Sequence, residues 1–139
     1  MNTISRQFYE TSKRLPNKVA VIQGSRQLTY AGLLALVQQQ ALVLRLNDLE
    51  RGDHVLCQLT GIDFVVLLLA CADAGICLVP MSKDAVRDTI AKAYAVCDCK
   101  AFIVSPCAED AGHGNSAKLK FAGRPSDNFL IITTSGSQT

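Results

Sequence analysis

The sequence predicts an α/β fold with a mostly parallel sheet and helices on both faces. Short apolar runs typical of strands alternate with longer segments of helical periodicity, and Gly- or Pro-containing turns separate them. A strand–helix–strand–helix–strand order favours right-handed crossover connections, which make neighbouring strands parallel. The length of 139 residues fits one compact unit, so we expect a single domain or subdomain.

The front of the chain predicts two helices and a hairpin. We expect a short helix over Ser5–Leu15, ended by Pro16, and then two strands that turn at Gly24. These strands cover residues 19–22 and 27–29. Thr29 is a suitable N-cap for a helix that continues to about Asn47.

The middle of the chain predicts the parallel units. The expected strands are His54–Leu59, Ile76–Val79 and Ala101–Val104, and the expected helices are Ile62–Ala74, capped by Gly75, and Asp84–Ala95. Residues 106–128 are rich in small and polar side chains, which predicts a flexible connector with a short strand near Lys118–Phe121. A final strand is expected over Phe129–Thr133.

Composition and charge exclude several classes of protein. Fourteen basic and twelve acidic residues are interspersed, so no nucleic-acid partner is indicated, and the basic cluster of Arg6, Lys13, Arg14 and Lys18 is interpreted as a solvated helix face. The longest apolar run, Phe64–Ala72, is too short for a membrane span. No secretory signal begins the chain, so a cytoplasmic location is expected.

The ionisable and thiol side chains suggest no catalytic or metal centre. We expect the six cysteines to be reduced, and the Cys97-Asp98-Cys99 spacing is too tight for a zinc knuckle. Asp53, after Gly52, is interpreted as a turn former. His54 and His113 are interpreted as satisfied or solvated polar residues. No catalytic residue and no metal ligand is therefore assigned.

The chain ends in a loop whose composition suits phosphate binding. Thr134, Ser135, Gly136 and Ser137 directly follow an apolar strand, and hydroxyls together with exposed amides near a glycine can hydrogen-bond phosphate oxygens. Taken alone, such a terminus is more often a frayed tail. The P-loop pattern Gly-Lys-Ser/Thr is absent.

Five short motifs follow one another along the chain: Pro16-Asn17-Lys18-Val19-Ala20-Val21, Leu28-Thr29-Tyr30-Ala31-Gly32-Leu33, Gly52-Asp53-His54-Val55, Asp73-Ala74-Gly75-Ile76-Cys77-Leu78-Val79-Pro80 and Thr134-Ser135-Gly136-Ser137. In this order they resemble the adenylate-forming superfamily of acyl-CoA synthetases, luciferases and nonribosomal-peptide adenylation domains. The resemblance covers nearly the whole chain and implies that residues 1–139 are the N-terminal subdomain of an acyl-CoA synthetase/luciferase-like fold. Gly32 stands where the family usually has Glu, and Gln138-Thr139 stands where it usually continues with Thr-Gly.

The resemblance implies an activity and its partners. In that family ATP and Mg²⁺ activate a carboxylic acid as an acyl-adenylate, and coenzyme A or a carrier-protein thiol then takes the acyl group, as in fatty-acid metabolism. Thr134, Ser135, Gly136 and Ser137 would contact ATP phosphates in an intact enzyme. The family's magnesium ligand, ribose-binding aspartate and catalytic lysine are expected beyond residue 139. We therefore expect this chain, cut within its phosphate-binding loop, to bind no cofactor and to be inactive alone.

Two alternatives remain open at this point. The chain could be a non-catalytic α/β module that forms a homo-oligomer or binds a protein through an exposed sheet edge. An unrelated doubly wound nucleotide binder is less favoured, because the turn after the first parallel strand, Thr60-Gly61-Ile62, offers one glycine only.

Overall fold

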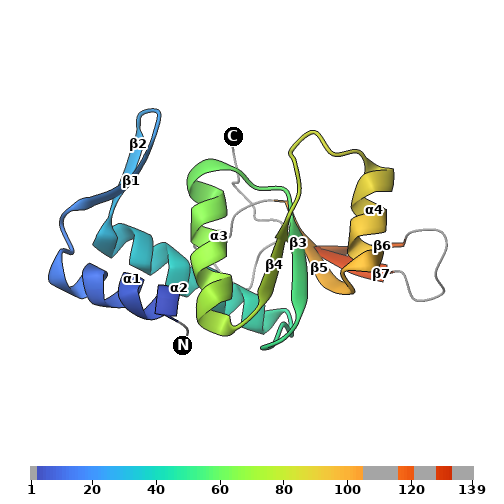
Figure 1. Cartoon of the computed structure of the whole chain (residues 1–139), viewed down its shortest axis with the longest axis horizontal. Helices are drawn as coiled ribbons and strands as arrows, with labels where there is room; N and C mark the ends of the chain where they lie inside the picture. The colour runs from blue at the N-terminus through green and yellow to red at the C-terminus, as the bar shows by residue number, and fades with distance from the viewer. Residues whose placement is uncertain (1–2, 105–115, 121–127, 133–139) are drawn as a thin grey trace.

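The computed structural model describes residues 3–104, 116–120 and 128–132 (Figure 1). Its elements follow one another as α1 (Thr3–Arg14), β1 (Val19–Gln23), β2 (Arg26–Thr29), α2 (Tyr30–Leu46), β3 (His54–Cys57), α3 (Gly61–Ala74), β4 (Cys77–Pro80), α4 (Arg87–Val96), β5 (Cys99–Ile103), β6 (Ser116–Lys120) and β7 (Asn128–Ile132). The order and type of the predicted elements are confirmed.

The strands form a separate hairpin and one larger sheet. β1 and β2 pair antiparallel with a turn at Gly24, as predicted. The five-stranded sheet has the order β4-β3-β5-β7-β6, in which β3, β4, β5 and β7 are parallel and β6 runs antiparallel to β7. The α/β class with a mostly parallel sheet is therefore confirmed.

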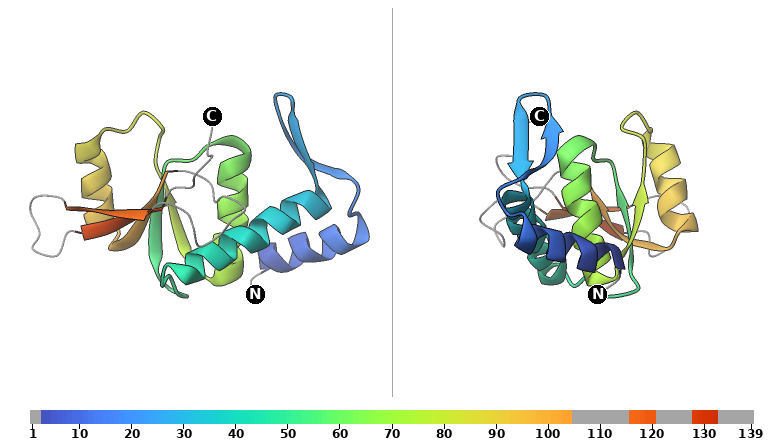
Figure 2. Two further views of the ribbon diagram at one scale, coloured as in Figure 1. Left: turned by 180° about the vertical axis from the view of Figure 1, so that it is seen from behind. Right: turned by 60° about the vertical axis from the view of Figure 1, so that its left-hand side comes forward.

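Helices cover both faces of this sheet. Figures 1 and 2 show α2 and α3 on one side and α4 on the other, with α1 packed on the outside of α2 and α3. Successive strand residues point to opposite faces. In β3, Val55 and Cys57 join the core beneath α2 and α3, whereas Leu56 joins the smaller core beneath α4.

Among the elements whose burial the structure describes, the strand β3 is the most deeply buried. Val55, Leu56 and Cys57 each expose 0% of their surface, and β3 is paired on both edges, to β4 and to β5. The larger core is completed mainly by aliphatic side chains of α2 and α3, among which Leu44 and Leu67 are also fully buried. A short apolar run therefore forms the centre of the fold.

Helix ends follow the local chemistry that the sequence predicts. Thr29 caps α2, because its Oγ1 accepts a hydrogen bond from the Gly32 amide at 3.1 Å. Gly75 ends α3 with a φ of 75°, a left-handed conformation that a glycine adopts without strain. Both caps are confirmed.

Several predicted boundaries are shifted. The helix α4 begins at Arg87 and not at Asp84, because Ser82 to Ala85 form a turn in which the Ser82 carbonyl accepts a hydrogen bond from the Ala85 amide at 3.0 Å. The strand β4 starts at Cys77 and includes Pro80. Proline is tolerated there because β4 is an edge strand of the described sheet.

The predicted connector is described only in part. The short strand expected near Lys118–Phe121 is present as β6, Ser116–Lys120, and most other residues of 106–128 lie outside the described residues. The last predicted strand is β7. Within the part of the chain that the structure describes, no helix combines the length and the apolar character needed to cross a bilayer.

Candidate functional site

The carboxyl ends of the parallel strands meet at one edge of the sheet, where α/β folds place their ligand sites. The strand β7 is parallel to β5, and Ile132 pairs with Ile103 at this edge. Thr134, Ser135, Gly136 and Ser137, the predicted phosphate-contacting residues, follow β7 in the sequence and lie outside the described residues. The described geometry therefore defines the edge from which that loop departs.

Gln58 organises this carboxyl edge. It directly follows β3, and its Nε2 donates hydrogen bonds to the carbonyls of Ser82 at 2.9 Å and Ala85 at 3.3 Å. Its backbone amide bonds to the Ile103 carbonyl at 3.1 Å. One side chain thus fixes the loop between β4 and α4 against the end of β3. In the sequence, Gln58 is a single polar residue within the expected strand His54–Leu59, and this position does not identify its partners.

The N-terminus of α3 also lies at this carboxyl edge, but one of its backbone amides already donates a hydrogen bond to a side chain. Thr60 is the N-cap residue and its side chain makes no capping hydrogen bond. Instead, Gln23 of the β1–β2 hairpin reaches across, and its Oε1 accepts from the Ile62 amide at 3.0 Å. A Cβ at Gly61, which has a φ of 63°, would overlap the Gln23 amide.

An ion pair supports the same contact. Arg26 Nη1 lies 3.2 Å from Asp63 Oδ1 in the first turn of α3. The hairpin therefore closes the helix end that an unrelated doubly wound nucleotide binder would present to phosphate. This contact argues against that alternative.

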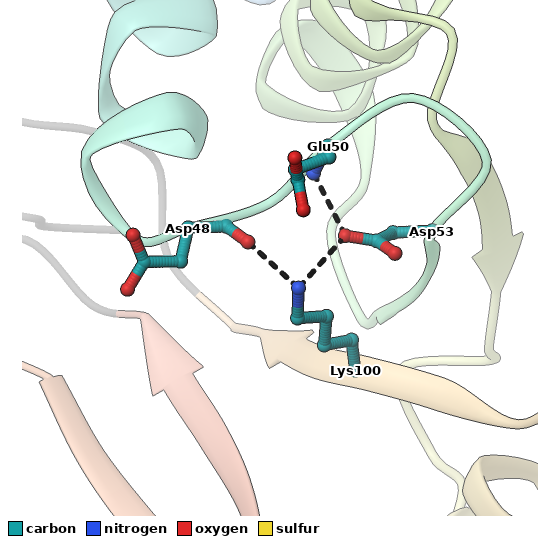
Figure 3. Close-up of polar contacts among 4 residues, drawn as sticks. All are labelled: Asp48, Glu50, Asp53 and Lys100. Atoms are coloured by element: carbon teal, nitrogen blue, oxygen red, sulfur yellow. Dashed lines mark hydrogen bonds and ion pairs between the residues drawn. The ribbon is translucent and has the colours of Figure 1, made fainter.

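The opposite, amino edge of the sheet carries a polar cluster around Lys100 (Figure 3). Lys100 Nζ donates to the Asp48 carbonyl at 2.8 Å and lies 3.1 Å from Asp53 Oδ2. The same Asp53 oxygen accepts the Glu50 amide at 2.7 Å. This carboxylate closes the turn before β3, so its interpretation as a turn former is confirmed.

The hydrogen bond from the Glu50 amide, with a smaller contribution from Lys100, holds the pKa of Asp53 below its usual value of 3.8, although partial burial opposes the shift. His54 Nδ1 lies 2.6 Å from the Cys97 carbonyl. Because a carbonyl only accepts, Nδ1 carries the proton, and His54 is the satisfied polar residue that was predicted. This edge lies opposite the strand ends from which the predicted loop departs.

The thiols are mostly buried in the two cores. The five cysteines in the described part of the chain are free, and burial raises the pKa of both Cys71 and Cys99 to about 12. In the same residues, no three His, Cys, Asp or Glu side chains are grouped so that they could hold a metal ion.

Comparison with known proteins identifies the family. The family model described as "AMP-binding enzyme" matches residues 8–137, which is nearly the whole chain. The chain belongs to the AMP-binding enzyme family. The resemblance drawn from the sequence motifs is therefore confirmed, and the match corresponds to the N-terminal portion of adenylation-domain proteins related to peptide synthetases and CoA ligases.

Relatives of this member of the family include a linear gramicidin synthase subunit. A linear gramicidin synthase polypeptide of Brevibacillus parabrevis is 34% identical over 103 residues, which is 73% of this chain and 1% of that protein. The solved N-terminal subdomain of NpsA from Klebsiella oxytoca is 26% identical with a TM-score of 0.69, and the match covers 75% of this chain and 28% of that one. The chain thus spans a small part of these relatives.

A third relative supports the fold alone. O-succinylbenzoate coenzyme A synthetase (MenE) from Bacillus subtilis, solved in complex with AMP, is 17% identical with a TM-score of 0.66. The match covers 70% of this chain and 26% of that one. The α/β architecture of this chain is therefore also found in that coenzyme A synthetase.

The capping role of Gln23 can be tested by a matched pair of substitutions. Gln23→Ala removes the acceptor of the Ile62 amide and should lower the free energy of unfolding by about 0.5–1.5 kcal/mol. Thr60→Ala, at the N-cap position itself, should change it by less than about 0.5 kcal/mol. Urea unfolding followed by circular dichroism measures both. A larger loss in Thr60→Ala than in Gln23→Ala would contradict this assignment.

The Asp53 turn predicts a pH-dependent stability. Because the folded-state pKa of Asp53 is lowered, its contribution is complete above pH 3.8 and is lost as the pH falls through the folded value. Asp53→Asn should therefore destabilise the protein at pH 7, by about 1 kcal/mol or less, and its difference from the wild type should shrink in acid.

Lys100→Met separates the two interactions of Asp53. It removes the exposed ion pair and keeps the Glu50 hydrogen bond, which is the larger cause of the pKa shift. Urea midpoints between pH 7 and pH 3 should show that Lys100→Met retains most of the pH dependence that Asp53→Asn loses. Loss of that dependence in Lys100→Met would show that the ion pair, and not the turn, lowers the pKa.

Proposed function

We propose that this chain is the N-terminal part of an ATP-dependent ligase that activates a carboxylic acid as an acyl-adenylate and transfers it to a thiol. The observation that carries the proposal is the AMP-binding match over residues 8–137. Enzymes of this family use ATP and Mg²⁺. The chain spans only 28% or less of the relatives named above, so we further propose that it does not catalyse adenylation alone.

Thr134, Ser135, Gly136 and Ser137 would contact the ATP phosphates in the intact enzyme. The support is the family motif together with the direction of β7, which ends at the carboxyl edge level with β5. Neutral hydroxyls and amides would position the phosphates, while Mg²⁺ would stabilise their negative charge. The described residues offer no grouped ligands for Mg²⁺, so none is assigned.

The proposed acid is an amino acid or an aryl acid. Relatives include a gramicidin synthase, an artificially fused adenylation–PCP di-domain NRPS, and an NpsA N-terminal subdomain in complex with 3-hydroxybenzoyl-AMSN. These names favour a carrier-protein thiol as the acceptor over coenzyme A. They give no support to the role in fatty-acid metabolism that the acyl-CoA-synthetase resemblance suggested.

A second candidate is the non-catalytic interaction module. The observations that favour it are the edge position of β4 in the described sheet and two exposed leucines on α2, Leu42 at 42% and Leu46 at 57% exposure. A partner or a second copy would cover such surface. The two hypotheses predict different results for two observations. These are the association state of the chain and the gene sequence beyond Thr139.

Pyrophosphate exchange tests the proposed inactivity of the isolated chain. The 139-residue chain, incubated with ATP, Mg²⁺, labelled pyrophosphate and a panel of amino, aryl and fatty acids, should give no exchange above buffer. Robust exchange would contradict the proposed inactivity. Light scattering on the same sample should show a monomer, since a stable dimer would favour the interaction module.

The gene sequence after Thr139 extends the test. A reading frame that continues with a Pro-Lys-Gly stretch would support the ligase, and a stop codon would favour the module. In the longer polypeptide, Ser137→Ala should lower exchange at least about tenfold, because a hydrogen bond to a charged group contributes roughly 1.5–3 kcal/mol. The control, Ser25→Ala in the β1–β2 turn, should leave exchange unchanged. Equal activity of both variants would remove Ser137 from the site.

A further inference from the structure

Two thiols flank a single residue where α4 meets β5. Cys97 is the C-cap of α4, and its amide donates to the Ala93 carbonyl at 2.9 Å. Asp98 follows with a φ of 53°, and Cys99 is the first residue of β5. Both cysteines are free thiols. The proposed adenylation chemistry gives this pair no role.

The turn at Asp98 favours the approach of the two thiols. A left-handed residue brings its two neighbouring α carbons closer than extended backbone does, and disulfides need α carbons about 4.4–6.8 Å apart. Cys97 and Cys99 both pack in the small apolar core beneath α4. Burial raises the pKa of the Cys99 thiol to about 12, with smaller contributions from Cys97 and Cys77.

The central strand holds both cysteines in place. His54 Nδ1 donates to the Cys97 carbonyl at 2.6 Å, and the backbone of His54 is paired in register with Cys99. One residue of β3 therefore anchors both sides of the Asp98 turn. Because the turn is anchored at both sides, the backbones of the two cysteines cannot separate without breaking contacts to β3.

Small molecules can reach the pair from solvent. Cys97 is partly exposed, and Cys99 lies with Asp98 on the wall of an open pocket of about 290 Å³. Cys99 is the more buried thiol of the pair, at 8% exposure. Cys97 is thus the side chain that an oxidant meets first.

We propose that Cys97 and Cys99 form a reversible disulfide on exposure to a small-molecule disulfide such as oxidised glutathione. The Cys97 thiolate attacks one glutathione sulfur and releases the first glutathione thiolate. The Cys99 thiol then gives up its proton as its sulfur attacks the Cys97 sulfur of the mixed disulfide, and the second glutathione leaves. The two cysteines lose two electrons and two protons, which the two glutathione molecules take up.

The small ring makes this disulfide easy to reduce, which is a property of regulatory disulfides. Only Asp98 separates the cysteines, so the closed ring is strained, and strained disulfides are reduced readily. Oxidation would fix the junction between α4 and β5. The reduced pair is the form that the structure contains.

Trypsin provides a direct assay because Lys92 and Lys100 bracket the pair. The peptide of residues 93–100 contains Cys97 and Cys99 as its only cysteines. After incubation of the folded chain with a glutathione redox buffer and blocking of residual thiols, mass spectrometry should find this peptide lighter by about 2 Da than its reduced form. Absence of that species while iodoacetamide labels Cys97, or a cross-link from this peptide to Cys77, would overturn the proposal.

Two comparisons test the role of the turn. At one glutathione ratio, the ratio of oxidised to reduced peptide should be several-fold lower in urea than in the folded chain. Asp98→Gly, which keeps access to positive φ, should oxidise like the wild type, whereas Asp98→Val should oxidise several-fold less. Cys77→Ser serves as the matched control and should change nothing. Equal oxidation of the folded and unfolded wild-type chain would overturn the proposal.

Discussion

The burial of β3 on both faces is the constraint on which the rest of the structure depends. Three consecutive side chains, Val55, Leu56 and Cys57, are inaccessible to solvent because helices cover both sides of the sheet. Burial of both faces requires a crossover helix on each side. The strand order β4-β3-β5 meets this requirement, since α3 connects β3 to β4 on one face and α4 connects β4 to β5 on the other.

Polar side chains then fix the two ends of β3. Before its amino end, Lys100 and the Glu50 amide hold Asp53, and His54 holds the end of α4. After its carboxyl end, Gln58 holds the loop between β4 and α4. The apolar core alone would therefore not define the amino and carboxyl ends of the sheet. The carboxyl edge is the one from which the proposed phosphate-binding residues depart, and the amino edge carries the proposed thiol pair.

Features encoded by neighbouring residues could be predicted, and features that join distant residues could not. Thr29 and Gly75 act on their own helices, so residue type and position revealed both caps. Gln23 caps a helix that begins 38 residues later in the chain, and no local pattern announces this partner. The pairing of Lys100 with Asp53 was missed for the same reason. The helical pattern includes Asp84 in α4, because helix propensity does not foresee the Ser82 turn.

The family prediction depended on short motifs and not on contacts between distant residues. Ordered motifs along the whole chain led to the family, which comparison confirmed over residues 8–137. The terminal Thr134 to Ser137 segment lies outside the described residues, so its phosphate contacts remain a proposal. The match covers 28% of the NpsA N-terminal subdomain, so the acid that would be activated also remains a proposal.

Amide hydrogen exchange of the folded chain tests the central role of β3 most directly. Residues 55–57 should exchange most slowly, at rates set by global unfolding, because both edges and both faces of the strand are covered. The two-stranded hairpin of residues 19–29, which is separate from the sheet, should exchange at least about tenfold faster. Exchange of β3 as fast as that of the hairpin would contradict the account.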